Sequence, residues 1–212
     1  MLELNFQKAT NILCLGAHSD DIEIGCGGTI LKWIRERPGL NLQWVVFSAD
    51  GKRRAEAKSG AKFFLKGAAH EKTVVRQFKT SFFPFQGAPI KKFFETLKTS
   101  FEPDIVFVHH GEDRHQDHRL LCELTWNTFR RHLILEYEIP KYDGDLGSPN
   151  LFVRLDEAVA RRKAKELCRI FRTQKSRHWF SEETFLALMR LRGIECGSKY
   201  AEAFYCRKIA AA

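Results

Sequence analysis

Hydrophobic and polar residues alternate along this chain with two different periods. Short runs rich in β-branched and aromatic residues are typical of buried strands, and they occur at residues 11–17, 42–48, 73–78, 104–109, 133–139 and 203–207. Longer segments repeat their apolar residues every three or four positions, as helices do, and these are residues 28–37, 53–67, 89–100, 115–131, 156–172 and 181–193. Residues 141–150 are rich in glycine, proline and aspartate and are predicted to form a loop.

The order of these segments predicts the fold class. Strands and helices alternate through most of the chain, which favours an α/β fold: a Rossmann-like open, mostly parallel sheet with helices on both faces. Asp156 is a suitable N-cap for the helix that follows it, and Ser181 opens the last helix. The 212 residues contain no repeat, linker or low-complexity tract, so we expect a single domain over residues 1–212.

The cysteines and the apolar runs bear on the compartment. Six cysteines are scattered without a C-x-x-C pair, so reduced thiols in the cytoplasm are the simplest interpretation. Residues 1–10 lack the charged and apolar regions of a secretory signal. No apolar run approaches the roughly 18 residues of a membrane span. We therefore expect a cytoplasmic protein without a membrane span.

The charge is strongly positive, with 35 basic against 26 acidic residues and a net charge of +9. Part of it lies in residues 161–177, where Arg161, Lys165, Arg169 and Arg172 are spaced to fall on one helical face. A solvated helix surface explains this pattern, although attraction to phosphorylated or acidic substrates stays open. No nucleic-acid-binding motif accompanies the charge, so no nucleic-acid partner is expected.

Two polar clusters follow predicted strands. The first, residues 17–23, comes directly after the first strand, and the second, residues 109–118, comes directly after the fourth. Together they hold five of the eight histidines, so these residues are concentrated rather than dispersed. In an open α/β sheet, ligands bind beyond the carboxyl ends of the strands, where the strand order reverses. The clusters are therefore predicted to share one site.

The residue types in these clusters suit a catalytic metal. Such a metal needs about three nitrogen or oxygen ligands and an open position for water. His115 and His118 lie three positions apart at a helix start and can face the same side. Asp20 and Asp21 are adjacent and point in different directions, so one can bind the metal while the other acts as a base on water. Two histidines and a carboxylate suit Zn²⁺, and they also suit Fe²⁺.

At this point a family resemblance becomes specific. His18-Ser19-Asp20-Asp21 resembles the AHPDD signature of the PIG-L/LmbE zinc-dependent N-acetylglucosaminyl deacetylases, with serine in place of the usual proline. Residues 115–118, His-Gln-Asp-His, resemble the H-x-D-H signature of the same family. Further similarity lies at residues 25–29, at Arg53 with Glu56, and at residues 200–204. The resemblance therefore extends over nearly the whole chain.

The resemblance implies a role for each matching residue. His18, Asp21 and His118 would be the zinc ligands, and Asp20 the general base. His115 would stabilise the oxyanion, with Asp117 as its orienting partner in a pair that favours the imidazolium. Arg53 and Asp113 would bind substrate, although Arg53 could equally form a surface ion pair with a helix neighbour. The implied reaction removes the acetyl group from an N-acetylglucosamine-type sugar, a small-molecule substrate.

Several alternatives stay open. An amidase acting on a thiol-sugar conjugate would fit the same family. A nucleotide-binding domain would need G-x-G-x-x-G at the first turn, where this chain instead places carboxylates that would repel a pyrophosphate. A phosphohydrolase would need more carboxylates to bridge two metals. A nucleic-acid-binding protein using the basic helix would bind in a salt-dependent and metal-independent way. The sugar, its aglycone and the oligomeric state are not specified by the sequence.

Overall fold

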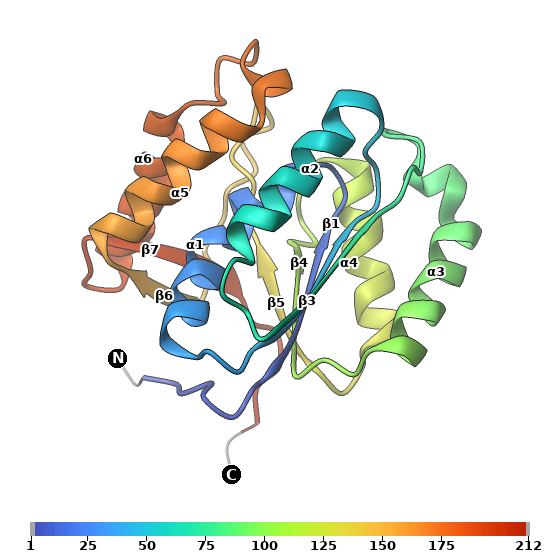
Figure 1. The fold of residues 1–212 in the computed structure, drawn as a ribbon, viewed down its shortest axis with the longest axis horizontal. Coiled ribbons are helices and arrows are strands. Elements are labelled where there is room, and N and C mark those ends of the chain that lie inside the picture. The colour runs from blue at the N-terminus through green and yellow to red at the C-terminus, as the bar shows by residue number, and fades with distance from the viewer. Residues whose placement is uncertain (1–2, 211–212) are drawn as a thin grey trace.

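A computed structural model describes residues 3–210, in which seven strands form one sheet with the order β3-β2-β1-β4-β5-β7-β6 (Figure 1). The first five strands are parallel, and β7 runs antiparallel to both β5 and β6. The strands are β1 (Asn11–Gly16), β2 (Asn41–Val46), β3 (His70–Val75), β4 (Ile105–His109), β5 (Leu133–Tyr137), β6 (Leu151–Leu155) and β7 (Tyr200–Tyr205).

Helices cover both faces of this sheet. They are α1 (Asp21–Glu36), α2 (Gly51–Phe64), α3 (Gly87–Ser100), α4 (Gln116–Thr128), α5 (Glu157–Ile170) and α6 (Glu182–Glu195), with short 3₁₀ turns η1 (Phe83–Gln86) and η2 (Arg172–Gln174). Helices α1, α2, α5 and α6 lie on one face, and α3 and α4 lie on the other (Figure 1). The predicted α/β class with a mostly parallel sheet is confirmed.

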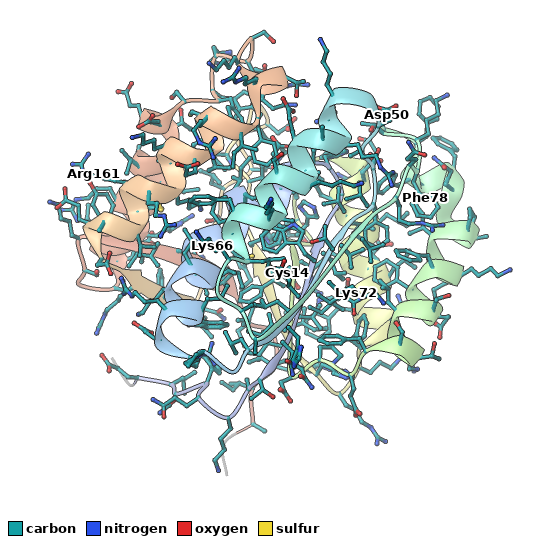
Figure 2. All side chains as sticks on the ribbon, in the orientation of Figure 1. Cys14, Asp50, Lys66, Lys72, Phe78 and Arg161 are labelled. Atoms are coloured by element: carbon teal, nitrogen blue, oxygen red, sulfur yellow. The ribbon has the colours of Figure 1, made fainter. Side chains whose placement is uncertain are left out.

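The core has two halves because side chains alternate across each strand. In β1, Ile12 and Cys14 pack into the cluster beneath α1, α2, α5 and α6, whereas Leu13 and Leu15 pack beneath α3 and α4. Cys14 lies near the centre of the molecule, and the basic Arg161 of α5 lies at its edge (Figure 2). All four basic residues predicted to share one helical face on this segment are exposed. Within residues 3–210, no helix is both long enough and apolar enough to cross a membrane.

Helix α1 begins seven residues earlier than predicted, at Asp21 rather than at residue 28. Gly25 and Gly27 precede the predicted helix but lie inside the observed one, where neighbouring side chains approach the helix backbone closely. A Cβ atom at Gly25 would lie 2.2 Å from Cδ2 of Tyr137, and one at Gly27 would lie 2.7 Å from Cε1 of Phe64. The glycines therefore let α1 pack against the sheet and α2, and Asp21 occupies the first helical position.

Strand β6 was not predicted. Its five residues lie directly between the predicted loop and the N-cap Asp156. This stretch was too short for its alternation of apolar and polar residues to indicate a strand. Leu151, Val153 and Leu155 are buried, and Arg154 between them is exposed. This alternation is that of a strand at the sheet edge, paired on one side with β7. The other predicted elements differ from the observed ones mainly at their ends.

A buried ion pair fastens α1 to the rest of the fold. Glu202 of β7 accepts hydrogen bonds from the backbone N–H groups of Gly28, at 2.7 Å, and Thr29, at 2.6 Å. Lys163 of α5 places Nζ 2.6 Å from Oε1 of Glu202 and also donates to the carbonyl oxygen of Ile24. Both charged side chains are only 3% exposed. Two elements from the C-terminal part of the chain thus hold the helix that carries Asp21.

Candidate metal centre

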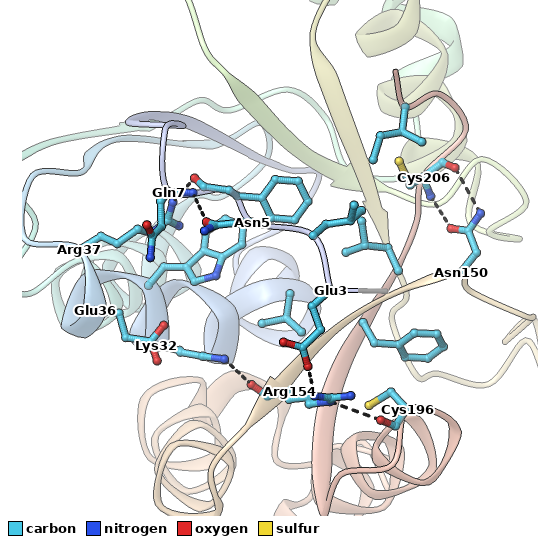
Figure 3. A pocket seen from close by; sticks show the side chains of 17 residues that line it. Glu3, Asn5, Gln7, Lys32, Glu36, Arg37, Asn150, Arg154, Cys196 and Cys206 are labelled. Atoms are coloured by element: carbon cyan, nitrogen blue, oxygen red, sulfur yellow. Dashed lines mark hydrogen bonds and ion pairs between the residues drawn. The ribbon is translucent and has the colours of Figure 1, made fainter. Parts of the chain in front are cut away.

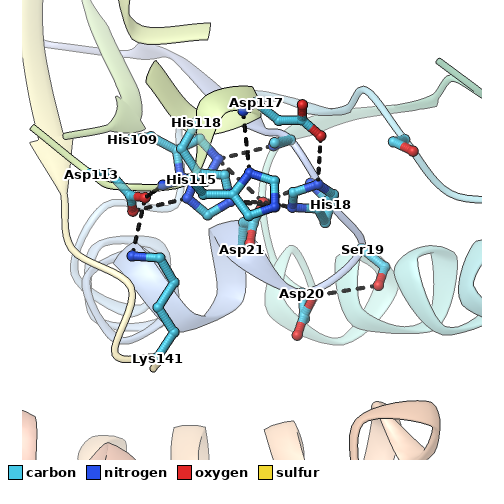
Figure 4. A network of polar contacts seen from close by, with 12 residues as sticks. His18, Ser19, Asp20, Asp21, His109, Asp113, His115, Asp117, His118 and Lys141 are labelled. Carbon is cyan, nitrogen blue, oxygen red and sulfur yellow. Dashed lines mark hydrogen bonds and ion pairs between the residues drawn. The ribbon is translucent and has the colours of Figure 1, made fainter. Parts of the chain in front are cut away.

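The two polar clusters meet where the strand order reverses. Strands β1 and β4 are neighbours in the sheet, but their outer neighbours β2 and β5 lie on opposite sides. The turn after β1 carries His18 to Asp20 and leads into α1, and the loop after β4 carries Asp113 and His115 and leads into α4. The structure therefore brings both clusters to one place, as the sequence predicted (Figure 4).

Three side-chain atoms form a compact triangle at this place. Nδ1 of His18 lies 3.3 Å from Oδ2 of Asp21 and 3.2 Å from Nε2 of His118. Nε2 of His118 lies 3.6 Å from the same Asp21 oxygen. Ligands of a tetrahedral zinc ion at about 2.0–2.1 Å are separated by about 3.3–3.4 Å. The triangle therefore has the size of one face of a zinc coordination tetrahedron.

The far nitrogen of each histidine in the triangle contacts a carboxylate. Nε2 of His18 lies 3.1 Å from Oδ2 of Asp117, and Nδ1 of His118 lies 2.9 Å from Oδ2 of Asp113. A carboxylate on the outer nitrogen fixes the ring orientation and directs the lone pair of the inner nitrogen towards the centre. This arrangement is typical of metal-binding histidines, and all five side chains of the set are buried.

The pKa values of the two histidines in the triangle are shifted in opposite directions. Burial lowers the pKa of His18, but the Asp21 and Asp117 carboxylates outweigh it and raise this pKa to about 9. Burial and His109 lower the pKa of His118 to about 3. The carboxylates around His18 thus favour a positive charge at this ring, which either a proton or a metal cation can supply.

Asp113 and Asp117 are held by contacts outside the triangle. Asp117 accepts the backbone N–H groups of Ser81, at 2.6 Å, and Phe83, at 3.1 Å. Asp113 accepts the N–H of His115 at 2.7 Å, and its Oδ1 lies 3.0 Å from Nζ of Lys141. Burial opposes ionisation of Asp113, but the hydrogen bond with His118 and the nearby positive charges lower its pKa. Each carboxylate therefore contacts one histidine of the triangle and two further groups, and these contacts fix its position.

Asp113 was predicted to bind substrate, and the structure places it elsewhere. Its carboxylate is buried behind His118, and both of its oxygens already have partners. No predicted strand or helix contained it, so the sequence offered no direction for its side chain.

Asp20 and Asp21 point in different directions, as adjacent residues at a helix start were expected to do (Figure 4). Asp21 points into the triangle, and Asp20 lies outside it with Ser19 Oγ at 3.4 Å and a guanidinium nitrogen of Arg53 at 3.9 Å. Burial and the neighbouring Asp21 raise the pKa of Asp20 to about 6. The pKa of Asp21 is held well below its usual value by the three surrounding histidines, although burial opposes this.

His115 is the N-cap of α4, and one of its ring nitrogens lies within 4.8 Å of a ring nitrogen of His18 and of one of His118. Its Nδ1 accepts the backbone N–H of Asp117 at 3.2 Å, which leaves the proton of a neutral ring on Nε2. Burial and His18 lower the pKa of His115. The predicted ion pair between His115 and the Asp117 carboxylate is not formed, because that carboxylate binds His18 and two backbone N–H groups instead.

His109, at the end of β4, is a site residue that the sequence prediction omitted. Its Nε2 lies 3.2 Å from Oδ2 of Asp21 and accepts the N–H of Ala17 at 3.0 Å. Its ring stacks on that of His118 with centroids 3.8 Å apart. The available signals were its place in the second polar cluster and its position as the last residue of a predicted strand.

Arg53, predicted to contact substrate or to pair on its own helix, faces Asp20 from the first turn of α2. Its helix neighbour Glu56 instead accepts hydrogen bonds from the backbone N–H and the hydroxyl of Thr173. The side chain of Arg53 is 29% exposed and its Nε has no partner, so the guanidinium keeps hydrogen-bonding capacity next to Asp20. Arg53 and Glu56 therefore do not pair with each other, and contact between Arg53 and substrate stays a prediction.

A large cavity of about 770 Å³ is lined by residues other than those of the triangle. Figure 3 shows this cavity from close by. It is lined by residues 3–7, by the C-terminal end of α1 and by β6, and the lining includes Lys32, Arg37 and Arg154. The triangle lies at the opposite end of α1, whose 16 residues span about 24 Å. The cavity is therefore separate from the metal centre.

Comparisons with known proteins agree with this site. The model of the family described as "PIG-L: GlcNAc-PI de-N-acetylase" matches residues 13–129, which include both polar clusters. The uncharacterized deacetylase YaiS of Escherichia coli strain K12 is 29% identical over 146 residues, which make up 63% of this chain and 76% of YaiS.

Solved structures share the fold at low sequence identity. N,N'-diacetylchitobiose deacetylase from Pyrococcus horikoshii superposes with a TM-score of 0.71 and 22% identity over 95% of this chain and 85% of that one. GalB, the 4-carboxy-2-hydroxymuconate hydratase of Pseudomonas putida KT2440, superposes with a TM-score of 0.73 and 16% identity over 96% and 98% of the two chains. Proteins with this fold therefore catalyse more than one reaction, so an activity has to be inferred from the residues of the site and not from the fold.

Proposed function

Because this chain belongs to the PIG-L family of GlcNAc-PI de-N-acetylases, we propose that it is a metal-dependent hydrolase of N-acetylated amino sugars. It would cleave the amide of an N-acetylglucosamine-type sugar or its conjugate, releasing acetate and a primary amine and leaving glycosidic bonds intact. The observation that carries this proposal is the triangle of His18, Asp21 and His118, backed by carboxylates and flanked by Asp20.

The donor set fits a divalent metal. His18, Asp21 and His118 would hold it, and the size of their triangle supports Zn²⁺, although the same ligands suit Fe²⁺. When bound, the ion would polarise the acetyl carbonyl and lower the pKa of water towards neutrality. Asp113 and Asp117 would keep the two histidines in their ligating orientations.

Asp20 would act as the general base. It stands next to the ligand Asp21 but outside the triangle, and its contacts with Ser19 at 3.4 Å and Arg53 at 3.9 Å are loose. It therefore keeps an oxygen available to take a proton from the attacking water. The same proton would pass to the amide nitrogen as the C–N bond breaks, so the sugar leaves as a neutral amine.

His115 would stabilise the oxyanion that forms on the acetyl oxygen. Since its Nδ1 accepts a backbone N–H, a neutral His115 carries its proton on Nε2 and can donate it to this oxygen. An imidazolium is not required. The Asp117 backbone would orient this ring, while the Asp117 side chain positions His18. Arg53 would contact the substrate beside Asp20.

The surroundings of the enzyme are also part of the proposal. All six cysteines are free, which supports a reducing, cytoplasmic compartment. We assign a small-molecule sugar as substrate and no nucleic-acid partner. The basic surface would favour sugars that carry phosphate or carboxylate groups.

Metal analysis and product detection test the proposal together. Purified protein should contain nearly one zinc or iron per chain, and mass spectrometry of an N-acetylglucosamine glycoside should show loss of one acetyl group. A chelator should abolish this product and added zinc should restore it. Release of free sugar with its acetyl group retained, or turnover that survives removal of the metal, would refute the proposal.

Single substitutions separate the roles. Asp20→Asn should retain the metal and lose activity by roughly 100-fold or more, as expected for a general base. Asp21→Asn should lose the metal. Asp143→Asn, an exposed aspartate on a loop, serves as the matched control and should change neither property. If Asp20→Asn loses the metal while Asp21→Asn keeps it, the two roles are reversed.

A further inference from the structure

Most of the net charge of this protein lies on two neighbouring helices. Together, α2, α5 and η2 contain 11 basic and 3 acidic residues, which account for +8 of the net charge of +9. α2 and α5 lie side by side on one face of the sheet (Figure 1). They run in opposite directions, because Arg162 near the start of α5 covers the ring of Phe63 at the end of α2. We term the solvent side of α2, α5 and η2 the basic face.

The cations of the basic face form two rows. Successive members are spaced by three or four positions, so each row follows one side of its helix. The rows consist of Arg54, Lys58 and Lys62 on α2, and of Arg161, Lys165, Arg169 and Arg172 on α5 and η2. Arg161 and Arg169 form ion pairs with glutamates of α5. The other five form no ion pair within residues 3–210. The second row extends about 12 Å from Arg161 to Arg169 at 1.5 Å per residue.

Both rows begin beside the metal centre. Arg53, in the first turn of α2, places a guanidinium nitrogen 3.9 Å from Oδ1 of Asp20. The N–H of Thr173 donates to Glu56 of α2 at 2.8 Å, so Arg172, the last cation of the second row, lies at this end of α2 as well. From here the rows extend away from the proposed general base.

The chemistry of the basic face restricts its partner. None of the large apolar side chains that the structure describes as exposed belongs to α2, α5 or η2, so the face has nothing to insert into a lipid bilayer. Its described residues also present no exposed ring for stacking of nucleic-acid bases, because Arg162 covers Phe63 with Cζ 4.8 Å from the ring centroid. Rows of cations complement a chain of spaced anions better than a single phosphate.

We propose that the basic face binds the acid groups of a polysaccharide that also contains N-acetylated amino sugars. One acetylated sugar would lie at the metal centre, and the acid groups of the neighbouring sugars would lie along the two rows. Such a chain is charged and hydrated, which agrees with a surface that is basic and not apolar. This inference rests on the proposed function for the deacetylated sugar and adds the substrate class, an acidic glycan polymer.

Two oligosaccharides with equal numbers of N-acetylglucosamine residues test the inference. Hyaluronan oligosaccharides alternate N-acetylglucosamine with glucuronate, whereas chitin oligosaccharides are uncharged. In calorimetric titration at low ionic strength, the parent should bind the hyaluronan oligosaccharide at least about 10-fold more tightly. This difference should disappear in about 0.5 M sodium chloride, because salt screens exposed charges. Acetate release should show the same preference in kcat/KM.

Substitutions in both rows separate the basic face from the overall charge. Lys58→Gln/Lys165→Gln removes one unpaired cation from each row and should weaken hyaluronan binding by roughly 5-fold to 30-fold. The control Lys92→Gln/Lys98→Gln removes the same charge from exposed positions of α3, on the opposite face of the sheet, and should change binding by less than about 2-fold. Lys58→Arg/Lys165→Arg should retain the binding, since it keeps both charges.

Equal binding of the two oligosaccharides by the parent would overturn the inference, and so would equal hyaluronan binding by the two glutamine variants. Tighter binding of a single-stranded oligonucleotide or of phosphatidylglycerol vesicles would also overturn it and assign the face to a nucleic acid or a membrane. The expected binding pattern without acetate release from either oligosaccharide would leave the basic face in place and defeat the proposed function. Acetate release from the chitin oligosaccharide alone would support the proposed function and overturn the inference.

Discussion

Replacing Lys163 by methionine should destabilise the protein by about 3 to 5 kcal/mol, because the carboxylate of Glu202 would stay buried without its counter-charge. Both side chains are 3% exposed, and Nζ lies 2.6 Å from Oε1. The substitution also deprives the carbonyl oxygen of Ile24 of the Lys163 donor. Two backbone N–H groups would still stabilise the carboxylate, so the loss should not exceed this range.

The double variant Lys163→Met/Glu202→Gln should recover part of this loss. Removing both charges eliminates the unpaired buried carboxylate, and the glutamine oxygen can still accept one N–H of α1. Removing one partner of a buried ion pair destabilises a protein more than replacing both partners. We therefore expect the double variant to be more stable than Lys163→Met by about 1 to 3 kcal/mol. Lys165→Met, at an exposed position on the same helix, should change stability by no more than about 0.5 kcal/mol.

Thermal and urea unfolding followed by circular dichroism would measure these differences. A chelator should be present throughout, because a metal bound only to the folded state would add its own stabilisation. For a domain of this size, a loss of 3 to 5 kcal/mol corresponds to a decrease in Tm of about 6 to 20 °C. A Tm for Lys163→Met equal to that of Lys165→Met would refute the reasoning, since it would mean that the buried pair contributes nothing.

Three further outcomes are expected. Asp117→Asn should weaken metal affinity by about 10-fold to 100-fold in a competition titration with a chromophoric chelator, because His18 would lose the carboxylate on its outer nitrogen; unchanged affinity would contradict this. Gly25→Ala should destabilise the protein by about 1 to 3 kcal/mol in urea, since its Cβ would overlap the Tyr137 ring, whereas Gly39→Ala meets open space and should not. Asp156→Ala should cost about 1 kcal/mol at neutral pH through loss of the α5 N-cap. The cap hydrogen bond lowers the pKa of Asp156, so its stabilisation is present above the unfolded pKa and is lost as pH falls through the folded one; an equal deficit in acid would exclude this cause.

The sheet could be predicted from sequence because its central strands are buried on both faces and stand out as continuous apolar runs. Helix α1 shows where such reasoning fails. Its first seven residues were not included in the predicted helix, and the glycines among them allow close packing against Tyr137 and Phe64, both of which are far away in the sequence. Local pattern contains no information about such contacts. Strand β6 was missed for a related reason, since its five residues acquire their meaning only when β7 pairs with them.

The candidate site also has residues that could be predicted from the sequence and contacts that could not. His18, Asp21 and His118 lie shortly after the carboxyl ends of two predicted strands, so their meeting could be expected from the α/β pattern. The partners of Asp117 could not, because they depend on the backbone conformation of a loop 34 to 36 residues away. Lys141 likewise reaches Asp113 from a loop without periodicity. The residue types of the candidate site could therefore be predicted from the sequence, whereas the contacts that orient them depend on tertiary structure.

The position of β7 has a consequence for the order in which the molecule can assemble. β7 lies between β5 and β6, yet it leaves the ribosome after both of them. The five parallel strands can associate while synthesis continues, but β6 has no place in the sheet until β7 arrives. Glu202 is part of β7. Before β7 is synthesised, this carboxylate is therefore missing as a partner for the N–H groups of Gly28 and Thr29 and for the charge of Lys163. A nascent chain that ends before residue 200 would contain all three proposed metal ligands, but α1, which carries one of them, Asp21, would not yet be fastened by Glu202.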